Sequence, residues 1–257
     1  MFNYIKNEMQ SVFKRKLTLT TAIVIVVICL IANLAVMAFT LIYGSDRDGV
    51  LGSNVLAFAT WCFCIPYYAC IVFADIVFGP KYPNPYIKDK ITKNLSRTQI
   101  YLGKFISALI LALIFMVEAF ICLLITTRIF HSDIQAYDIS LFVSNMLISI
   151  PLWLAGIAIA DLCLFSYTDK KKAYITYFIV TLIIPRFIML LAAEPISFAP
   201  FIAIRTILMT QSFGHIPYPA DPARNVPFII AEGFIYMIIA TVAGIVIFNK
   251  KKIKDTE

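Results

Sequence analysis

Three ionisable side chains interrupt the long apolar stretches of this 257-residue chain: Glu118, Arg186 and Glu232. A charge inside a hydrocarbon layer is costly, so such residues usually pair with one another or line a path for an ion or substrate. A Glu118–Arg186 ion pair is sterically possible. Spacing along the chain does not decide between structural ion pairs and a group that borders a substrate path or forms a proton relay.

A second group of ionisable residues, Asp75, Lys104 and Asp161, lies near the opposite ends of its apolar stretches. Side chains near the end of a membrane span can extend to the water interface. We therefore expect this inner group to reach the membrane surface.

The remaining residues with reactive or metal-binding side chains lack the spacing that a catalytic or metal site requires. The six cysteines lie within apolar stretches, with no C-x-x-C pair and no Cys/His cluster, and His131 and His215 are isolated. This pattern supports neither a disulfide framework nor a zinc site. The sequence also contains no G-x-x-x-x-G-K-[ST], H-E-x-x-H or G-x-S-x-G motif. We predict no catalytic residue, no metal site and no enzymatic activity for this chain.

The composition is that of an integral membrane protein: 61% of the residues are hydrophobic and 14% charged. Soluble domains have about 45–50% apolar and about 25% charged residues. A helix needs roughly 20 apolar residues to cross a bilayer. Six stretches meet this length, and residues 1–257 are predicted to form a single all-α transmembrane domain. The predicted spans are Leu17–Tyr43, Val50–Phe78, Arg97–Thr127, Ile139–Phe165, Ala173–Ala193 and Phe228–Phe248.

The basic residues are distributed unevenly about these spans. All but five of the 22 Lys and Arg residues fall on the side that holds both termini. Cytoplasmic flanks are enriched in Lys and Arg, so this asymmetry predicts that both termini are cytoplasmic and that the number of spans is even. The five exceptions are Arg47, Arg128, Arg186, Arg205 and Arg224.

Residues 1–16, before the first span, have apolar side chains at helical spacing and polar ones on the opposite face. A basic amphipathic helix of this kind lies in the membrane interface. The alternative is a frayed start of the first span. The apolar residues are Phe2, Ile5, Met9, Val12 and Phe13.

Residues 79–95 join the second and third spans on the predicted cytoplasmic side. Asn84 and Pro85 resemble the start of a helix. Ile87, Ile91 and Leu95 would then share one face. The segment is suited to act as a lever for a cytoplasmic partner, although it could also be a plain connector. The other residues of this candidate partner-binding site are Lys88 and Lys90.

Ser96 and Gln99 follow this segment with the spacing of a capping box, which predicts the first turn of the third span. On the opposite side of the membrane, residues 194–227 form the longest loop. Its first half is apolar, and non-spanning apolar backbone at membrane depth must be buried in protein or line a cavity. We predict a partly re-entrant external hairpin, with a helix lying flat on the outer surface as the alternative.

The sequence resembles the permease subunits of ABC-2 type ATP-binding-cassette transporters. The resemblance rests on the interfacial N-terminal helix, the six spans with internal termini, and the motif Leu95-Ser96-Arg97-Thr98-Gln99-Ile100-Tyr101-Leu102-Gly103-Lys104-Phe105, preceded by Asp75 and Gly79. Members of this family typically carry Ser-Arg, then Tyr, Gly and Lys, at the entry to the third span. The chain departs from the family in its proline-rich segment 80–85, where relatives more often have Gly-Thr.

The resemblance implies a multi-pass protein of a bacterial cell membrane that works with partner chains. Family members pair two permease chains, identical or paralogous, with cytoplasmic ATPase subunits. The ATPase binds ATP and magnesium, so no cofactor is expected on this chain, and no nucleic-acid partner is expected. Residues 84–94 would be the coupling helix and residues 2–13 the interfacial helix. The small size is closest to bacterial exporters of antimicrobial or toxin peptides, which move hydrophobic or amphipathic cargo.

The rival class is a secondary carrier or channel that needs no ATPase. It would use the membrane-embedded charges Glu118, Arg186 and Glu232 as its coupling site. Such carriers often contain inverted repeats, and we find no internal repeat in this sequence.

Overall fold

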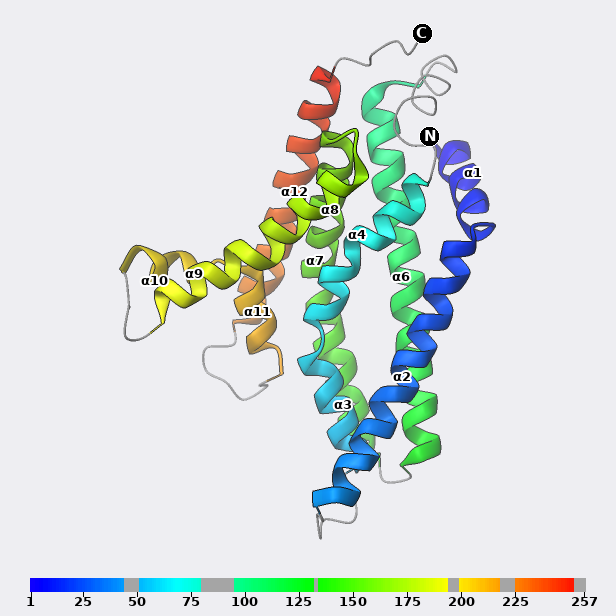
Figure 1. Cartoon of the computed structure of the whole chain (residues 1–257), viewed down its shortest axis with the longest axis vertical. Coiled ribbons are helices and arrows are strands. Elements are labelled where there is room, and N and C mark those ends of the chain that lie inside the picture. Colours follow the sequence, from blue (N-terminus) through cyan, green and yellow to red (C-terminus); the bar gives the residue numbers. More distant parts are fainter. Residues whose placement is uncertain (44–50, 80–94, 132–133, 194–198, 218–224, 252–257) are drawn as a thin grey trace.

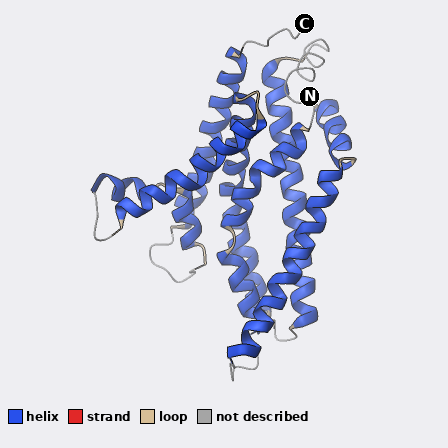
Figure 2. Cartoon of the chain, viewed as in Figure 1, coloured by secondary structure: helices blue, strands red, loops and turns tan. Residues whose placement is uncertain are grey.

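A computed structural model describes the chain in six stretches, and every regular element within them is helical (Figures 1 and 2). Five of these helices are long and apolar enough to cross a membrane, and a bent pair of shorter helices can form a sixth span. The predicted all-helical membrane class is therefore confirmed. The described residues are 1–43, 51–79, 95–131, 134–193, 199–217 and 225–251.

Four of the predicted spans are continuous helices whose ends lie within a few residues of those expected. The third of these, α7, is the central helix of the bundle. In its most apolar stretch 78% of the residues are buried, against 11–28% in the corresponding stretches of the other candidate spans. The four helices are α2 (Lys16–Tyr43), α6 (Arg97–Phe130), α7 (Ala136–Ser166) and α12 (Val226–Lys250).

The second predicted span is not a single helix. It consists of α3 (Leu51–Trp61) and α4 (Cys64–Phe78), which meet at a bend of 59°. Pro66 explains the break, because it has no N–H for the carbonyl four residues earlier and its ring clashes with that turn. The indole N–H of Trp153 donates to the Phe63 carbonyl at 2.9 Å, which fixes this corner to α7.

The fifth predicted span is also irregular. It runs from α8 (Lys170–Phe178) through a π-helical turn, η1 (Ile179–Ile183), into α9 (Ile184–Ala192). Within η1, the Ile184 N–H donates to the Ile179 carbonyl five residues back. Pro185 follows directly and cannot donate to the preceding turn, which accounts for the local widening. In Figure 1, α9 slants away from the other long helices.

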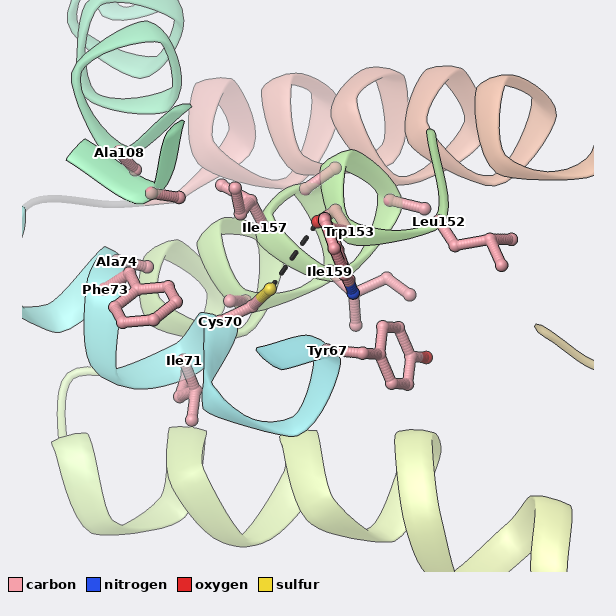
Figure 3. Packing of buried hydrophobic residues seen from close by; sticks show 14 of the residues in the cluster. Tyr67, Cys70, Ile71, Phe73, Ala74, Ala108, Leu152, Trp153, Ile157 and Ile159 are labelled. Atoms are coloured by element: carbon pink, nitrogen blue, oxygen red, sulfur yellow. Dashed lines mark hydrogen bonds between the residues drawn. The ribbon is translucent and has the colours of Figure 1, made fainter. Parts of the chain in front are cut away.

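The buried core surrounds α7 and brings helices close together. A Cβ on Gly233 of α12 would lie 2.4 Å from the Pro151 carbonyl carbon of α7, so only glycine allows this approach. On the α4 side of α7, the Cys70 thiol points at the Trp153 carbonyl, 3.5 Å away (Figure 3). Apolar side chains of α4 and α7 fill the space around this contact.

The N-terminal segment is a separate helix, α1 (Phe2–Phe13), as predicted. Lys14 and Arg15 interrupt the helix before α2 begins, so α1 is not a frayed start of the first span. Its buried residues are Tyr4, Glu8 and Val12. Val12, one of the apolar residues at helical spacing, packs against the core of the bundle. Phe2 and Phe13 are exposed, and the position of α1 at the membrane interface stays a prediction.

The predicted external hairpin contains two short helices, α10 (Ala199–Arg205) and α11 (Met209–His215), while residues 194–198 and 218–224 lie outside the described residues. Helix α10 contacts α9 and has no buried residue. Helix α11 contacts α12 and buries Met209, Ser212 and Phe213. The re-entrant depth of the hairpin stays a prediction.

Candidate functional site

The three charged residues predicted in the outer halves of the spans lie in different surroundings. Glu118 on α6 is half-buried, whereas Arg186 on α9 is exposed. No ion pair joins Glu118 to Arg186 within the described residues. The structure therefore does not pair these two residues.

Glu232 on α12 is the most enclosed of the three, with 5% of its surface exposed. One carboxylate oxygen accepts a hydrogen bond from the Ser212 hydroxyl of α11. The other oxygen, Oε1, has no hydrogen-bond partner among the described residues. This contact links α11 to α12.

Most of the predicted coupling segment lies outside the described residues: Ile87, Lys88, Lys90 and Ile91 all fall within 80–94. Leu95 is described, is half-buried and packs against the core. The two ends of the segment are also described, and basic side chains tie each of them to other elements.

At the first end, α4 stops at Gly79, whose φ of 73° favours glycine. The Gly79 N–H donates to the Asp75 carbonyl at 2.9 Å. The Arg15 guanidinium donates to the Ile76 carbonyl, and the Lys104 ammonium donates to the Val77 carbonyl at 2.8 Å. Cations suit the negative end of a helix dipole, so these bonds both satisfy and stabilise the C-terminus of α4.

At the second end, α6 begins with the capping box predicted from Ser96 and Gln99, which is confirmed in full. Arg97, which directly follows Ser96, contacts the C-terminus of α12. Its guanidinium donates to the carbonyls of Asn249 at 2.9 Å and Lys251 at 2.7 Å, and to that of Phe248 at 3.3 Å. The start of α6 is thereby tied to the end of α12.

Lys251 extends this network to the central helix. Its ammonium donates to the carbonyls of Phe165 at 2.9 Å and Ser166 at 3.3 Å, at the C-terminus of α7. Burial lowers the pKa of Lys251, because the charged form loses solvation. The C-termini of α4, α7 and α12 are therefore all capped by basic side chains at the same end of the bundle.

Lys104 and Asp161 do not reach the surface, so the expectation that they extend to the interface is wrong for both; each has 0% exposure. Lys104 instead forms an ion pair with Glu8 of α1 at 2.7 Å. The ring of Tyr4 covers Gly103, where a Cβ would lie 2.3 Å from a ring carbon. Helix α1 thus brings a carboxylate to Lys104 and closes the site from water.

Asp161 on α7 is fully buried, and neither of its carboxylate oxygens has a hydrogen-bond partner among the described residues. By contrast, the carboxylate of Asp75 on α4 has partners for both of its oxygens. It forms an ion pair with Lys170 and accepts a hydrogen bond from the Tyr174 hydroxyl at 3.2 Å.

The sequence analysis did not identify Glu8, Arg15 or Lys251 as members of this network. Glu8 carried a usable signal, because it is the single acidic residue among the first 45 positions. Arg15 and Lys251 were counted as topology signals only, and their partners are backbone carbonyls that no side-chain pattern reveals.

The fold defines the class of this chain: it is an all-helical protein with several long apolar helices suited to a membrane. No group of three or more His, Cys, Asp or Glu residues in the described part could hold a metal ion. The chain belongs to the DUF2705 family, described as a protein of unknown function, whose family model matches residues 20–254. No curated protein matches the chain.

Proposed function

We propose that this chain is the transmembrane permease subunit of an ATP-binding-cassette exporter of the ABC-2 type. It spans the cell membrane six times, with the α3–α4 pair as one span. A separate cytoplasmic ATPase hydrolyses ATP, and a second permease chain completes the path. The cargo is hydrophobic or amphipathic, such as an antimicrobial or toxin peptide.

The observation that carries this proposal is the way both ends of segment 79–95 are anchored. Arg15 and Lys104 hold the last carbonyls of α4, and Arg97 joins the start of α6 to the end of α12. A force applied to the segment would therefore reach α1, α4, α6 and α12 together. Such anchoring supports a lever, because a displacement of the segment is then transmitted to several helices at once.

The proposed orientation rests on where the basic residues gather. The start of α1, the start of α6 and the end of α12 lie at the same end of the bundle in Figure 1, and the bonds of Arg97 agree with this. The lysines concentrate at this end, which favours the cytoplasmic side.

Cysteines introduced at Arg47 and Ala220 are expected to react with a membrane-impermeant thiol reagent from outside intact cells. Cysteines at Lys90 and Lys171 should react only after the membrane is permeabilised. The six native cysteines lie in apolar segments, so the parent chain provides the background signal. Labelling of position 90 from outside would overturn the proposed topology.

The partnership with an ATPase is tested by co-expression with a P-loop subunit, such as one encoded beside this chain. We expect the purified chain alone to hydrolyse no ATP and to co-purify with that subunit when both are present. The measurement is ATPase activity together with affinity co-purification in detergent. Robust hydrolysis by the chain alone, or failure to retain the ATPase, would contradict the proposal.

One observation favours the secondary-carrier alternative: Glu232 is buried, and its Oε1 oxygen has no hydrogen-bond partner in the part of the chain that the structure describes. Buried carboxylates of this kind take part in the proton relays of transporters. In that case, vesicles containing the chain alone would move cargo in response to an imposed proton gradient. The permease proposal predicts no such movement without the ATPase.

A further inference from the structure

The second half of the fifth span leaves the rest of the bundle. Helix α9 has its main contacts with its own neighbours in the chain, η1 and α10, and it slants away from the other long helices in Figure 1. Its buried residues are Pro185 and Ala192, whereas Phe187 and Leu190 are 58% and 61% exposed. Helix α9 therefore presents an apolar face that this chain itself does not cover.

Arg186 lies in the middle of this helix and is also exposed. It takes part in no hydrogen bond or ion pair within the described part of the chain. It is the single charged residue of α9 and stands between Pro185 and Phe187. A charge among apolar side chains at membrane depth is costly unless an opposite charge lies beside it. The uncovered face of α9 therefore calls for a partner that supplies a carboxylate.

Among the acidic residues that the structure describes, Glu118 of α6 is the one that lies within a span and on its outward face. It is half-buried, and Ile114 and Ile121, one turn before and after it, are exposed. Like Arg186, it forms no ion pair within the described residues. The other acidic residues are buried in the bundle (Glu8, Asp161 and Glu232), paired with Lys170 (Asp75), or placed at helix starts (Asp138 and Asp169).

We propose that a second copy of this chain covers α9, and that Arg186 of each copy pairs with Glu118 of the other. On the proposed topology both residues lie in the outer half of their spans. A two-fold axis along the membrane normal would form the same ion pair twice. Contact of α9 with its own copy would instead bring the two Arg186 side chains together, and like charges repel.

This pairing rests on the proposed function in one respect, the expectation that two permease chains associate. It goes further by making the second chain a copy of the first and by assigning the contact to α6 and α9. It needs no ATPase, so it can be measured on this chain alone.

Co-purification in mild detergent of two differently tagged copies, expressed together without an ATPase, tests the pairing. We expect native copies to co-purify. Arg186→Glu should lower the co-purified amount by about tenfold or more, because carboxylates then face each other at both contacts. Glu118→Arg should have the same effect, because guanidinium groups then face each other.

Mixing the two single variants separates a contact between chains from one within a chain. A copy with Arg186→Glu has carboxylates at both positions, and a copy with Glu118→Arg has cations at both. The two variants should therefore bind each other as native copies do, although neither binds itself. One chain that carries both substitutions should also regain self-association, because the charges are then exchanged.

Lys172→Glu is the matched control. It reverses an exposed charge at the start of α8, at the other end of the same span, and should leave self-association unchanged. Gel filtration in detergent shows whether each variant is folded. Arg186→Gln, which removes the charge without reversing it, replaces Arg186→Glu should that variant misfold, and it should also lower the co-purified amount.

Native copies that do not co-purify would overturn the inference. So would folded, charge-reversed copies that still bind themselves, which would mean that Arg186 faces lipid, or the failure of the two single variants to bind each other. An ATPase retained by a chain that does not self-associate would also overturn the pairing, but it would leave the proposed function standing with a paralogous second chain.

Discussion

Lys104→Met is expected to destabilise the protein by about 3–5 kcal/mol, the cost of breaking a buried ion pair by removing one partner. The substitution removes the ion pair that Lys104 makes with the enclosed Glu8 carboxylate. It also removes the hydrogen bond to the Val77 carbonyl at the end of α4. Methionine retains most of the apolar volume, so the loss reflects charge and not packing. The measurement is the free energy of unfolding in detergent.

Two variants separate this effect from a general sensitivity to lysine removal. Lys170→Met breaks the other ion pair, but the Lys170 side chain is 31% exposed, so a loss of only about 0–1 kcal/mol is expected. Lys104→Met combined with Glu8→Met should recover much of the lost stability, because the buried carboxylate that loses this ion pair is also removed. Equal losses in Lys104→Met and Lys170→Met would contradict a buried, paired Lys104.

The sequence was sufficient for features that depend on local composition. Apolar length located the long helices, because a chain in lipid must bond its own backbone. The Ser96–Gln99 spacing located the start of α6, because a capping box is complete within four residues. Helical periodicity identified α1 as a helix, although it did not reveal the buried face that contains Tyr4 and Glu8.

Features that join distant segments were missed, since periodicity does not say which helix faces meet. The Glu8–Lys104 pair joins residues 96 positions apart, and Arg97 reaches carbonyls more than 150 positions away. The bend in the second span is a different case. Pro66 is a sequence signal for this bend, but residues 50–78 are uniformly apolar and were therefore predicted as one continuous span. The predicted coupling residues Ile87 and Ile91 lie outside the described residues and stay predictions.

Ile87→Asp combined with Ile91→Asp is expected to abolish stable binding of the partner ATPase. In the predicted coupling helix these two residues lie one turn apart on the apolar face that would sit in the ATPase. Each buried aliphatic side chain contributes about 1.5–3 kcal/mol, and each buried, unpaired carboxylate adds a desolvation cost. The combined loss of several kcal/mol corresponds to a weakening of roughly a hundredfold or more in affinity.

The membrane part of the double variant should remain folded, because the anchors at both ends of the segment come from Arg15, Lys104 and Arg97 and are unchanged. Gel filtration in detergent checks this, and pull-down of the co-expressed ATPase measures the binding. Lys88→Ala and Lys90→Ala are the matched controls in the same segment, and partly solvated charges at a rim should have much smaller effects. Full retention of the ATPase by the double-aspartate variant would make segment 79–95 a connector only. The anchored ends would then serve the stability of α4 and α6 alone, and the secondary-carrier alternative would be favoured.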